Sequence, residues 1–254
     1  MYQSEALRLS MPGMPSNPDA AWIHVWPMYL ENVEDLEVDL LDVLGLPEQD
    51  AANRFRFSEH RLNYIKRRAF YRNILSLYTG ENPRTISFSR TAKGKPFLPS
   101  NRLDFSTSSS GQYALIAVSN FSVGIDIERH RESLCGDRSL GDQFLSHPEI
   151  RRLETAPESA KCKLLFDYWT LKEAYLKGIG TGLLVDPRKI AFDIDTKTFL
   201  KAAAAKPRPE RNWNFRQPEL VTNYSMAVAT NRKGAELEIV TAAMSTDSKI
   251  RLIS

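Results

Sequence analysis

The hydrophobic pattern of this chain predicts two long helices of different character. Apolar residues at positions 62, 65, 69, 70, 74 and 77 repeat with the period of one helix face, so we expect an amphipathic helix over residues 54–78 that ends at Gly80. Between residues 163 and 179, apolar side chains surround almost the whole helical circumference. A helix with that pattern is buried on nearly all sides.

Short apolar runs and two-residue alternation predict strands around these helices. We expect a hairpin in which a strand over residues 113–118 turns back into a strand over residues 123–128. Short helices are expected over residues 31–42 and 148–154. Strands mixed with helices in this order indicate the α+β class. The other predicted strands cover residues 22–28, 86–89, 97–98, 189–194, 212–216, 225–230 and 236–242.

Two acidic residues mark the second strand of the predicted hairpin. Val123, Ile125 and Ile127 alternate with Asp126 and Glu128, so the apolar side chains take one face and both carboxylates the other. Their backbone positions are then about 7 Å apart. Like charges at that spacing repel unless a cation lies between them, and oxygen ligands of this kind suit Mg²⁺. The alternative is a solvated acidic face on a hairpin strand.

The buried helix carries its own charged stripe. Trp169, Glu173 and Lys177 recur at i, i+4 and i+8, so the carboxylate and the ammonium lie on one side of the helix beside an indole. A buried glutamate must be paired or bound to a metal. The alternative is an internal Glu173–Lys177 ion pair that supports a core helix.

Composition is that of an ordinary soluble globular protein. The 254 residues carry a net charge of +3, and no apolar run is long enough to cross a membrane. Residues 1–20 lack the pattern of a secretory signal and are expected to form a loose leader. Cys135 and Cys162 match no metal or redox spacing, so we expect reduced thiols in a cytoplasmic protein.

Basic residues crowd the amphipathic helix and the turn before it. We favour a solvated basic face for most of them. The functional alternative is electrostatic capture of an acidic carrier protein or of the phosphates of a ligand. No aromatic-basic motif of the kind that stacks bases is present, so nucleic acid is not an expected partner. The basic residues are Arg54, Arg56, Arg61, Lys66, Arg67, Arg68 and Arg72.

Taken together, these segments resemble a known family. The sequence GIDIE at residues 124–128, followed by WTLKEAYLK at residues 169–177, is similar to the paired signature of the Sfp-type phosphopantetheinyl transferases. RTAKGKPFL at residues 90–98 resembles the Gly-Lys-Pro segment of that family. GTGL at residues 180–183 resembles the Gly-x-Gly-Leu that follows its long helix. The resemblance extends from about residue 20 to about residue 230.

The resemblance implies an architecture and an activity. The chain would form two similar subdomains related by a pseudo-two-fold, each a small antiparallel sheet packed on a long helix. We expect them over residues 21–121 and 122–254, with the site in the cleft between them. The implied reaction transfers the 4′-phosphopantetheine arm of coenzyme A to a serine of an acyl or peptidyl carrier protein and releases adenosine 3′,5′-bisphosphate.

The resemblance also assigns roles at the transfer centre. Asp126, Glu128 and Glu173 would hold Mg²⁺, and Mn²⁺ would be accepted by the same ligands. Glu173 is also the candidate base for the carrier serine. Lys177 would contact the phosphates, and Lys172 would support the same site.

A second group of residues is expected to receive the nucleotide end of coenzyme A. Arg90 and Lys95 would contact it, with Gly94 and Pro96 shaping the segment. Ser108 and Ser109 occupy the loop where the family carries Ser-His, so the histidine that contacts a coenzyme A phosphate is absent.

A second cationic position is also lost. A basic residue is usual in the family just before the Arg54–Phe57 run, where this chain has Ala51, Ala52 and Asn53. Because two cationic contacts are missing, we expect weaker recognition of the 3′-phosphate and use of dephospho-coenzyme A.

Two rival functions remain open. A Mg²⁺-dependent pyrophosphate hydrolase would cleave coenzyme A without a carrier protein. A non-catalytic coenzyme A-binding module would bind the nucleotide and form no product. In either case we expect a monomer, because one chain would contain both halves of the site.

Overall fold

A computed structural model describes Pro12 and residues 20–30, 37–135, 138–196, 198–202, 213–240, 242–244 and 250–252. The expected leader over residues 1–20 therefore lies outside the described residues, apart from Pro12 and Ala20. The first half of the chain forms β1 (Trp22–Tyr29), α1 (Glu37–Val43), α2 (Leu46–Ala52), α3 (Ser58–Thr79), η2 (Pro83–Thr85), β2 (Ser89–Arg90), β3 (Pro96–Phe97), β4 (Asp104–Ser110) and β5 (Tyr113–Ser119).

The second half alternates short helices and strands around one long helix. Its elements are β6 (Val123–Arg129), α4 (Glu132–Cys135), α5 (Arg138–Phe144), α6 (His147–Glu154), α7 (Glu158–Ile179), η3 (Gly182–Leu184), η4 (Pro187–Lys189), β7 (Ile190–Asp193), β8 (Thr198–Ala202), β9 (Asn214–Arg216), β10 (Tyr224–Thr230), β11 (Glu236–Ile239), β12 (Ala242–Met244) and β13 (Ile250–Leu252).

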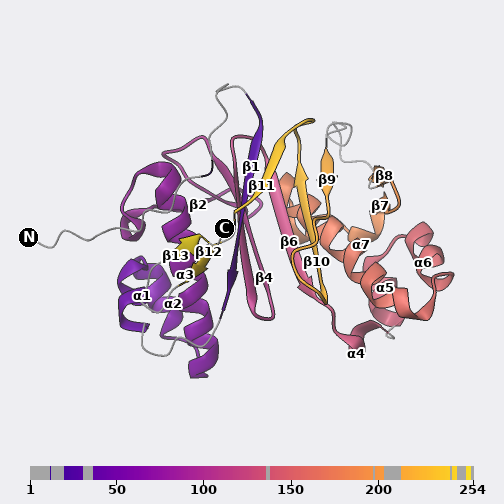
Figure 1. The fold of residues 1–254 in the computed structure, drawn as a ribbon, viewed down its shortest axis with the longest axis horizontal. Coiled ribbons are helices and arrows are strands. Elements are labelled where there is room, and N and C mark those ends of the chain that lie inside the picture. Colours follow the sequence, from indigo (N-terminus) through magenta and orange to yellow (C-terminus); the bar gives the residue numbers. More distant parts are fainter. Residues whose placement is uncertain are drawn as a thin grey trace, which may run out of the picture.

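Two sheets face each other between the two long helices (Figure 1). The first has the strand order β11-β1-β5-β4 and the second the order β6-β10-β9. α3 covers the outer face of the first sheet and α7 that of the second (Figure 1). Separate apolar clusters fill the three layers, between α3 and the first sheet, between the two sheets, and between the second sheet and α7. The α+β prediction is confirmed.

The predicted hairpin of β5 and β6 is wrong. β5 pairs with β1 and β4 in the first sheet, whereas β6 pairs antiparallel with β10 in the second. The chain crosses between sheets at residues 120–122 because the apolar faces of both strands, Leu115 and Ala117 on one and Ile125 and Ile127 on the other, meet in the layer between the sheets.

One strand of the C-terminal half crosses to the first sheet. β11 pairs in parallel with β1, so that Trp22 lies opposite Glu236 and Val25 opposite Ile239. The expected division at residue 122 therefore does not describe this strand.

The basic helix is shorter than predicted. α3 begins at Ser58, because residues 54–57 form the turn that follows α2, a helix the hydrophobic pattern did not reveal. Gly80 ends α3 in the left-handed region with φ of 70°, as predicted. The acidic helix begins at Glu37, and its predicted start lies outside the described residues.

Residues 132–135 form the short helix α4, and the position of this helix determines the state of both cysteines. α4 packs against α7, which brings the Cα atoms of Cys135 and Cys162 to 4.7 Å, and the two residues form a disulfide. The expectation of reduced thiols is wrong in this structure. The two cysteines are 27 positions apart in the sequence, so no local pattern indicated the contact.

Among the described helices, none has the length and apolar character needed to cross a membrane.

Candidate active site

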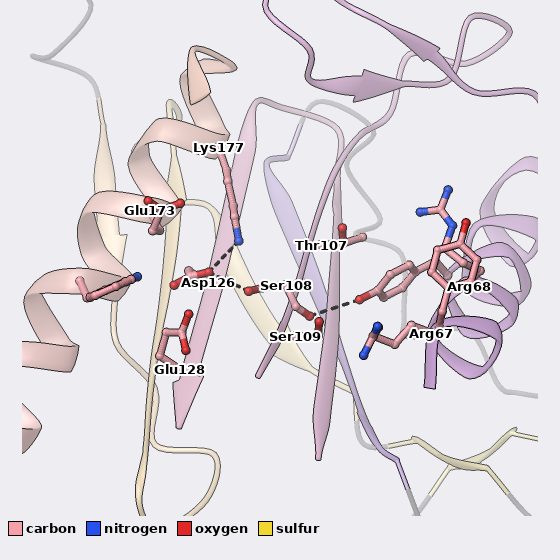
Figure 2. A pocket seen from close by; sticks show the side chains of 12 residues that line it. Arg67, Arg68, Thr107, Ser108, Ser109, Asp126, Glu128, Glu173 and Lys177 are labelled. Atoms are coloured by element: carbon pink, nitrogen blue, oxygen red, sulfur yellow. Dashed lines mark hydrogen bonds and ion pairs between the residues drawn. The ribbon is translucent and has the colours of Figure 1, made fainter. Parts of the chain in front are cut away.

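A cleft of about 500 Å³ lies between the two long helices. α3 forms one side, β6 and α7 form the other, and β4 lies between them (Figure 2). The cleft is lined by Tyr64, Arg67, Arg68, Tyr71, Thr107, Ser108, Ser109, Asp126, Glu128, Trp169, Glu173 and Lys177.

Close packing of β6 on α7 brings the acidic strand and the charged helix stripe together. A Cβ atom on Gly124 would lie 1.9 Å from the carbonyl oxygen of Ala174 and 2.4 Å from the amide nitrogen of Gly178. Only glycine permits this approach of backbone to backbone. As a result, Asp126 on the same face of β6 reaches the side of α7 that carries Lys177 (Figure 2).

Asp126 is the most enclosed carboxylate of the cleft, with 3% of its surface exposed. Its Oδ1 atom accepts hydrogen bonds from Ser108 Oγ at 2.7 Å and from Lys177 Nζ at 2.6 Å. Its Oδ2 atom is buried and has no hydrogen-bond partner among the described residues. A buried oxygen without a donor is costly, so this atom is suited to a cation.

Glu128 and Glu173 flank Asp126 (Figure 2). Burial raises the pKa of Glu128, and the charge of Asp126 raises it further, while a hydrogen bond from Ser110 Oγ at 2.7 Å opposes the shift. Burial also raises the pKa of Glu173, with Asp126 adding to the effect and Lys177 opposing it. Asp126 therefore destabilises the charged forms of Glu128 and Glu173, and a divalent cation would relieve this repulsion.

Serine side chains of β4 hold β6 in place. They take the role that a paired strand would play, since each hydroxyl accepts a backbone N–H of β6, and two of them also donate to the acidic pair. Asp104 extends the series at one end. The backbone contacts are Val123 N to Asp104 Oδ2 at 2.9 Å, Ile125 N to Ser106 Oγ at 3.1 Å, Ile127 N to Ser108 Oγ at 3.3 Å and Arg129 N to Ser110 Oγ at 3.0 Å.

The donor atoms of these residues suit a hard divalent cation, but their side chains do not form a complete coordination shell. All three acidic side chains offer oxygen, the donor type that Mg²⁺ prefers, and one of these oxygens is buried and unpaired. Within the described ranges, however, no three Asp, Glu, His or Cys side chains converge closely enough to hold an ion in their present rotamers. Lys177 instead places its ammonium on Asp126.

The structure places Lys172 away from this site. Its side chain is fully buried, with its ammonium 2.6 Å from Glu149 Oε2, and it donates to the carbonyl oxygens of Phe144, Pro187 and Ile190. The expectation that Lys172 supports the transfer centre is not met by these contacts. The cause is helical geometry, because Lys177 follows Lys172 by five positions and this spacing turns the two side chains to different faces of α7.

The Gly-Lys-Pro segment forms the β2–β3 hairpin outside the lining of the cleft. Lys95 Nζ contacts Asp104 and donates to the carbonyl oxygen of Val123 at 3.1 Å. Arg90 Nη1 donates to the carbonyl oxygen of Gly94 at 2.9 Å, and Pro96 opens β3. In this structure Lys95 therefore joins the hairpin to β6, and a nucleotide contact by these residues stays a prediction.

Ser108 and Ser109 line the cleft, and two of the basic residues of the amphipathic helix lie opposite them together with two tyrosines. Tyr64, Arg67, Arg68 and Tyr71 recur at i, i+3, i+4 and i+7, so they share one face of α3 and point into the cleft. Arg67 and Arg68 are partly exposed and line the cleft, so binding of a ligand's phosphates, the alternative to a solvated basic face, stays open for these two arginines. The spacing of arginine and tyrosine was the signal that could have revealed them.

Comparisons with known proteins agree with this arrangement. Residues 34–121 match the family model described as 4′-phosphopantetheinyl transferase, N-terminal, and residues 122–229 match that of the 4′-phosphopantetheinyl transferase superfamily. This chain belongs to the 4′-phosphopantetheinyl transferase superfamily.

Three relatives illustrate the similarity. The 4′-phosphopantetheinyl transferase HetI of Nostoc sp. is 37% identical over 63% of this chain and 70% of its own length. The transferase gsp of Aneurinibacillus migulanus is 30% identical over 55% of this chain and 56% of its own. The transferase psf-1 of Bacillus pumilus is 26% identical over 86% and 93%.

A solved ACPS–CoA complex from Chronobacterium ammoniagenes aligns more weakly. It covers 43% of this chain and 94% of its own, with 17% identity and a TM-score of 0.32.

Proposed function

We propose that the cleft between α3 and α7 transfers the 4′-phosphopantetheine arm of coenzyme A to a carrier-protein serine. The observation that carries this proposal is the buried, partnerless Oδ2 atom of Asp126, flanked by Glu128 and Glu173 and facing Lys177. Three carboxylates and an ammonium in one cleft suit a polyphosphate with a divalent cation.

Asp126, Glu128 and Glu173 are the residues that would hold Mg²⁺, or Mn²⁺ in its place. The bound ion would screen the charge that grows on the pyrophosphate as it leaves. Glu173 would reach the ion by a change of rotamer, since the three carboxylates do not converge on one point among the described residues. Ser108 and Ser110 hold the other two carboxylates.

Lys177 is the cation that this chain itself supplies to the reacting phosphates. Its ammonium is held by Asp126 Oδ1, and 29% of the side chain is exposed to the cleft. An oriented ammonium stabilises negative charge that develops on the phosphoryl oxygens, which is worth most in a site shielded from water. Transfer should therefore depend on Lys177 even when substrate binding does not.

Glu173 is the proposed general base. The carrier serine oxygen attacks the phosphorus that bears the pantetheine arm, the bond from this phosphorus to the bridging oxygen breaks, and adenosine 3′,5′-bisphosphate leaves. The serine proton passes to Glu173. Glu173 lines the cleft between Asp126 and Lys177 (Figure 2), and a carboxylate in that place can take the proton directly or through one water.

Intact-mass spectrometry of apo carrier proteins tests the proposal. Each carrier is incubated with the protein, coenzyme A and Mg²⁺, and a mass gain equal to one phosphopantetheine arm is the expected result. Loss of coenzyme A without a gain on any carrier would indicate pyrophosphate hydrolysis. Unchanged coenzyme A that stays bound would indicate a non-catalytic binding module.

We also propose that the protein works as a monomer in the cytoplasm with an acidic carrier. Both sides of the cleft come from one chain, which supports a monomer. Fractionation of cells that produce the protein tests the compartment, because we expect the protein in the cytoplasmic fraction. Recovery from a membrane or exported fraction would contradict the cytoplasmic assignment.

A further inference from the structure

Lys95 lies where the two halves of the chain meet, and its ammonium contacts three different elements. It pairs with Asp104 at the start of β4 and donates to the carbonyl oxygen of Val123, the first residue of β6, at 3.1 Å. It also donates to the carbonyl oxygen of Gly178, in the last turn of α7, at 3.4 Å. An ammonium has three hydrogens, so these three acceptors use all of its donors. The Lys95 ammonium therefore has no donor left for the phosphate of a ligand.

The ion pair of Lys95 and Asp104 satisfies both backbone groups of Val123. Asp104 Oδ2 accepts the N–H of Val123 at 2.9 Å, while Lys95 binds the carbonyl oxygen of the same residue. β6 is an edge strand of its sheet, so its backbone groups on the side of β4 need partners from outside that sheet. Only 13% of the Lys95 side chain and 21% of the Asp104 side chain are exposed, which strengthens the attraction between their charges. The pair anchors the first residue of the acidic strand as a neighbouring strand would.

The third contact extends this anchor to the long helix. The last carbonyl groups of a helix have no partner within it, and the helix dipole favours a cation near them. Lys95 supplies that cation at Gly178, which directly follows Lys177 in the sequence. Val123 lies three positions before Asp126. One ammonium thus joins the backbone beside Lys177 to the start of the strand that carries Asp126.

We propose that Lys95 and Asp104 are positioning residues for the transfer reaction. Their ion pair holds the start of β6 against the end of α7, and so fixes where Lys177 meets Asp126. The inference rests on the proposed function, and it gives the Lys95 ammonium a role other than contact with the nucleotide. A shift of about 1 Å in a reacting group can lower a rate about 100-fold, so an ion pair outside the cleft can control the transfer step.

Kinetics and calorimetry together separate positioning from nucleotide binding. Lys95→Met removes the ammonium and keeps an unbranched side chain. We expect kcat for transfer to a carrier to fall about 10- to 100-fold. The affinity for adenosine 3′,5′-bisphosphate, measured by calorimetry, should stay within about 2-fold of wild type. Lys95→Arg keeps a charged donor and should recover part of kcat. Lys93→Met removes the same charge from an exposed position of the β2–β3 hairpin and should change neither value.

Two results of these measurements would overturn the proposal. A nucleotide affinity that falls about 10-fold in Lys95→Met, with kcat unchanged, would assign the ammonium to the nucleotide instead. A lower melting temperature with an unchanged kcat in the folded variant would show that the ion pair only stabilises the protein.

A double variant tests whether the two residues act as one unit. Asp104→Asn removes the charge that holds the Lys95 ammonium. Because each residue acts through the other, the variant with both Lys95→Met and Asp104→Asn should lose about as much of kcat as Lys95→Met alone. Single losses that multiply in the double variant would overturn the ion pair as the positioning unit.

Hydrogen exchange separates this proposal from the transferase proposal. In Lys95→Met, backbone amides at the start of β6 and the end of α7 should exchange about 10-fold faster than in the wild type, and in Lys93→Met they should not. If exchange rises in this way while the wild type modifies no carrier, the ion pair holds the two elements and the transferase proposal fails alone. If carriers are modified but Lys95→Met changes neither exchange nor kcat, the positioning proposal fails alone.

Discussion

Two faces of α7 show how one helix serves chemistry on one side and stability on the other. Glu173 and Lys177 face the cleft, where they are partly exposed and lie beside the carboxylates of β6. Lys172 faces the opposite way and is saturated by Glu149 and three backbone carbonyl oxygens. The two lysines share one short motif, yet only the contacts distinguish the residue that can act on a substrate from the one that fixes the fold.

The largest expected effect is on the cleft face. Glu173→Gln removes the proposed base and a metal ligand while keeping the side-chain volume, so the transfer rate should fall by about 10²–10⁴-fold. Single-turnover mass spectrometry of a carrier measures this rate. The melting temperature should stay close to that of the wild type, and a rate within a few-fold of wild type would remove Glu173 from the mechanism.

The opposite face should respond in stability rather than in rate. Lys172→Met leaves Glu149 charged and buried without its partner, which should cost about 3–5 kcal/mol in the free energy of unfolding. Urea denaturation measures this loss. The matched change Lys177→Met should cost less stability, because that side chain is partly exposed and Asp126 keeps its hydrogen bond from Ser108 Oγ. Similar losses from both variants would break the distinction between the faces.

A smaller effect is expected where β4 supports the acidic strand. Ser110→Ala removes the donor to Glu128 Oε2 and the acceptor for Arg129 N–H, so the carboxylate loses its fixed orientation. The Mg²⁺ concentration for half-maximal activity should rise about 10-fold, since residues that orient metal ligands affect metal affinity to this degree. Ser110→Thr keeps the hydroxyl and should restore most of the affinity. An unchanged Mg²⁺ requirement in the alanine variant would show that Ser110 only stabilises the strand.

The smallest effect concerns a buried group far from both faces of α7. Burial lowers the pKa of His24 from 6.5 to about 4, and its Nδ1 atom lies 2.9 Å from the hydroxyl of Tyr78. Because the unfolded chain binds this proton more readily, stability should be complete above about pH 6.5 and decline as the pH falls toward about 4. His24→Asn lacks the titrating group, so its stability should depend less on pH in this window. Parallel profiles for both proteins would exclude His24 as the cause.

Periodicity in the sequence predicted the elements that carry the transfer centre. Alternation placed Asp126 and Glu128 on one face of β6, and helical spacing placed Glu173 beside Lys177. Both patterns are local, so they survive folding. The assignment of Lys172 failed because it treated the motif as one unit, although Lys172 and Lys177 lie on different faces of the helix.

Long-range contacts account for what the sequence did not reveal. The partner strand of β6 is β10, about 100 residues later, and no local pattern distinguishes that pairing from a hairpin with β5. The serines of β4 have no apolar alternation that would predict a strand. Their contribution to the fold is the hydrogen bonds that their hydroxyls make with the backbone of β6. The Cys135–Cys162 contact and the place of Arg67 and Arg68 in the cleft likewise depend on which elements pack together in the folded chain.

The most direct test of the account compares the two lysines of α7 in one assay. Lys172→Met and Lys177→Met are each incubated with coenzyme A, Mg²⁺ and an apo carrier under conditions where circular dichroism shows both to be folded, and the mass of the carrier is followed over time. We predict transfer near the wild-type rate for Lys172→Met and a loss of about 10²–10³-fold for Lys177→Met. A folded Lys172→Met protein that transfers nothing, beside an active Lys177→Met, would contradict the account.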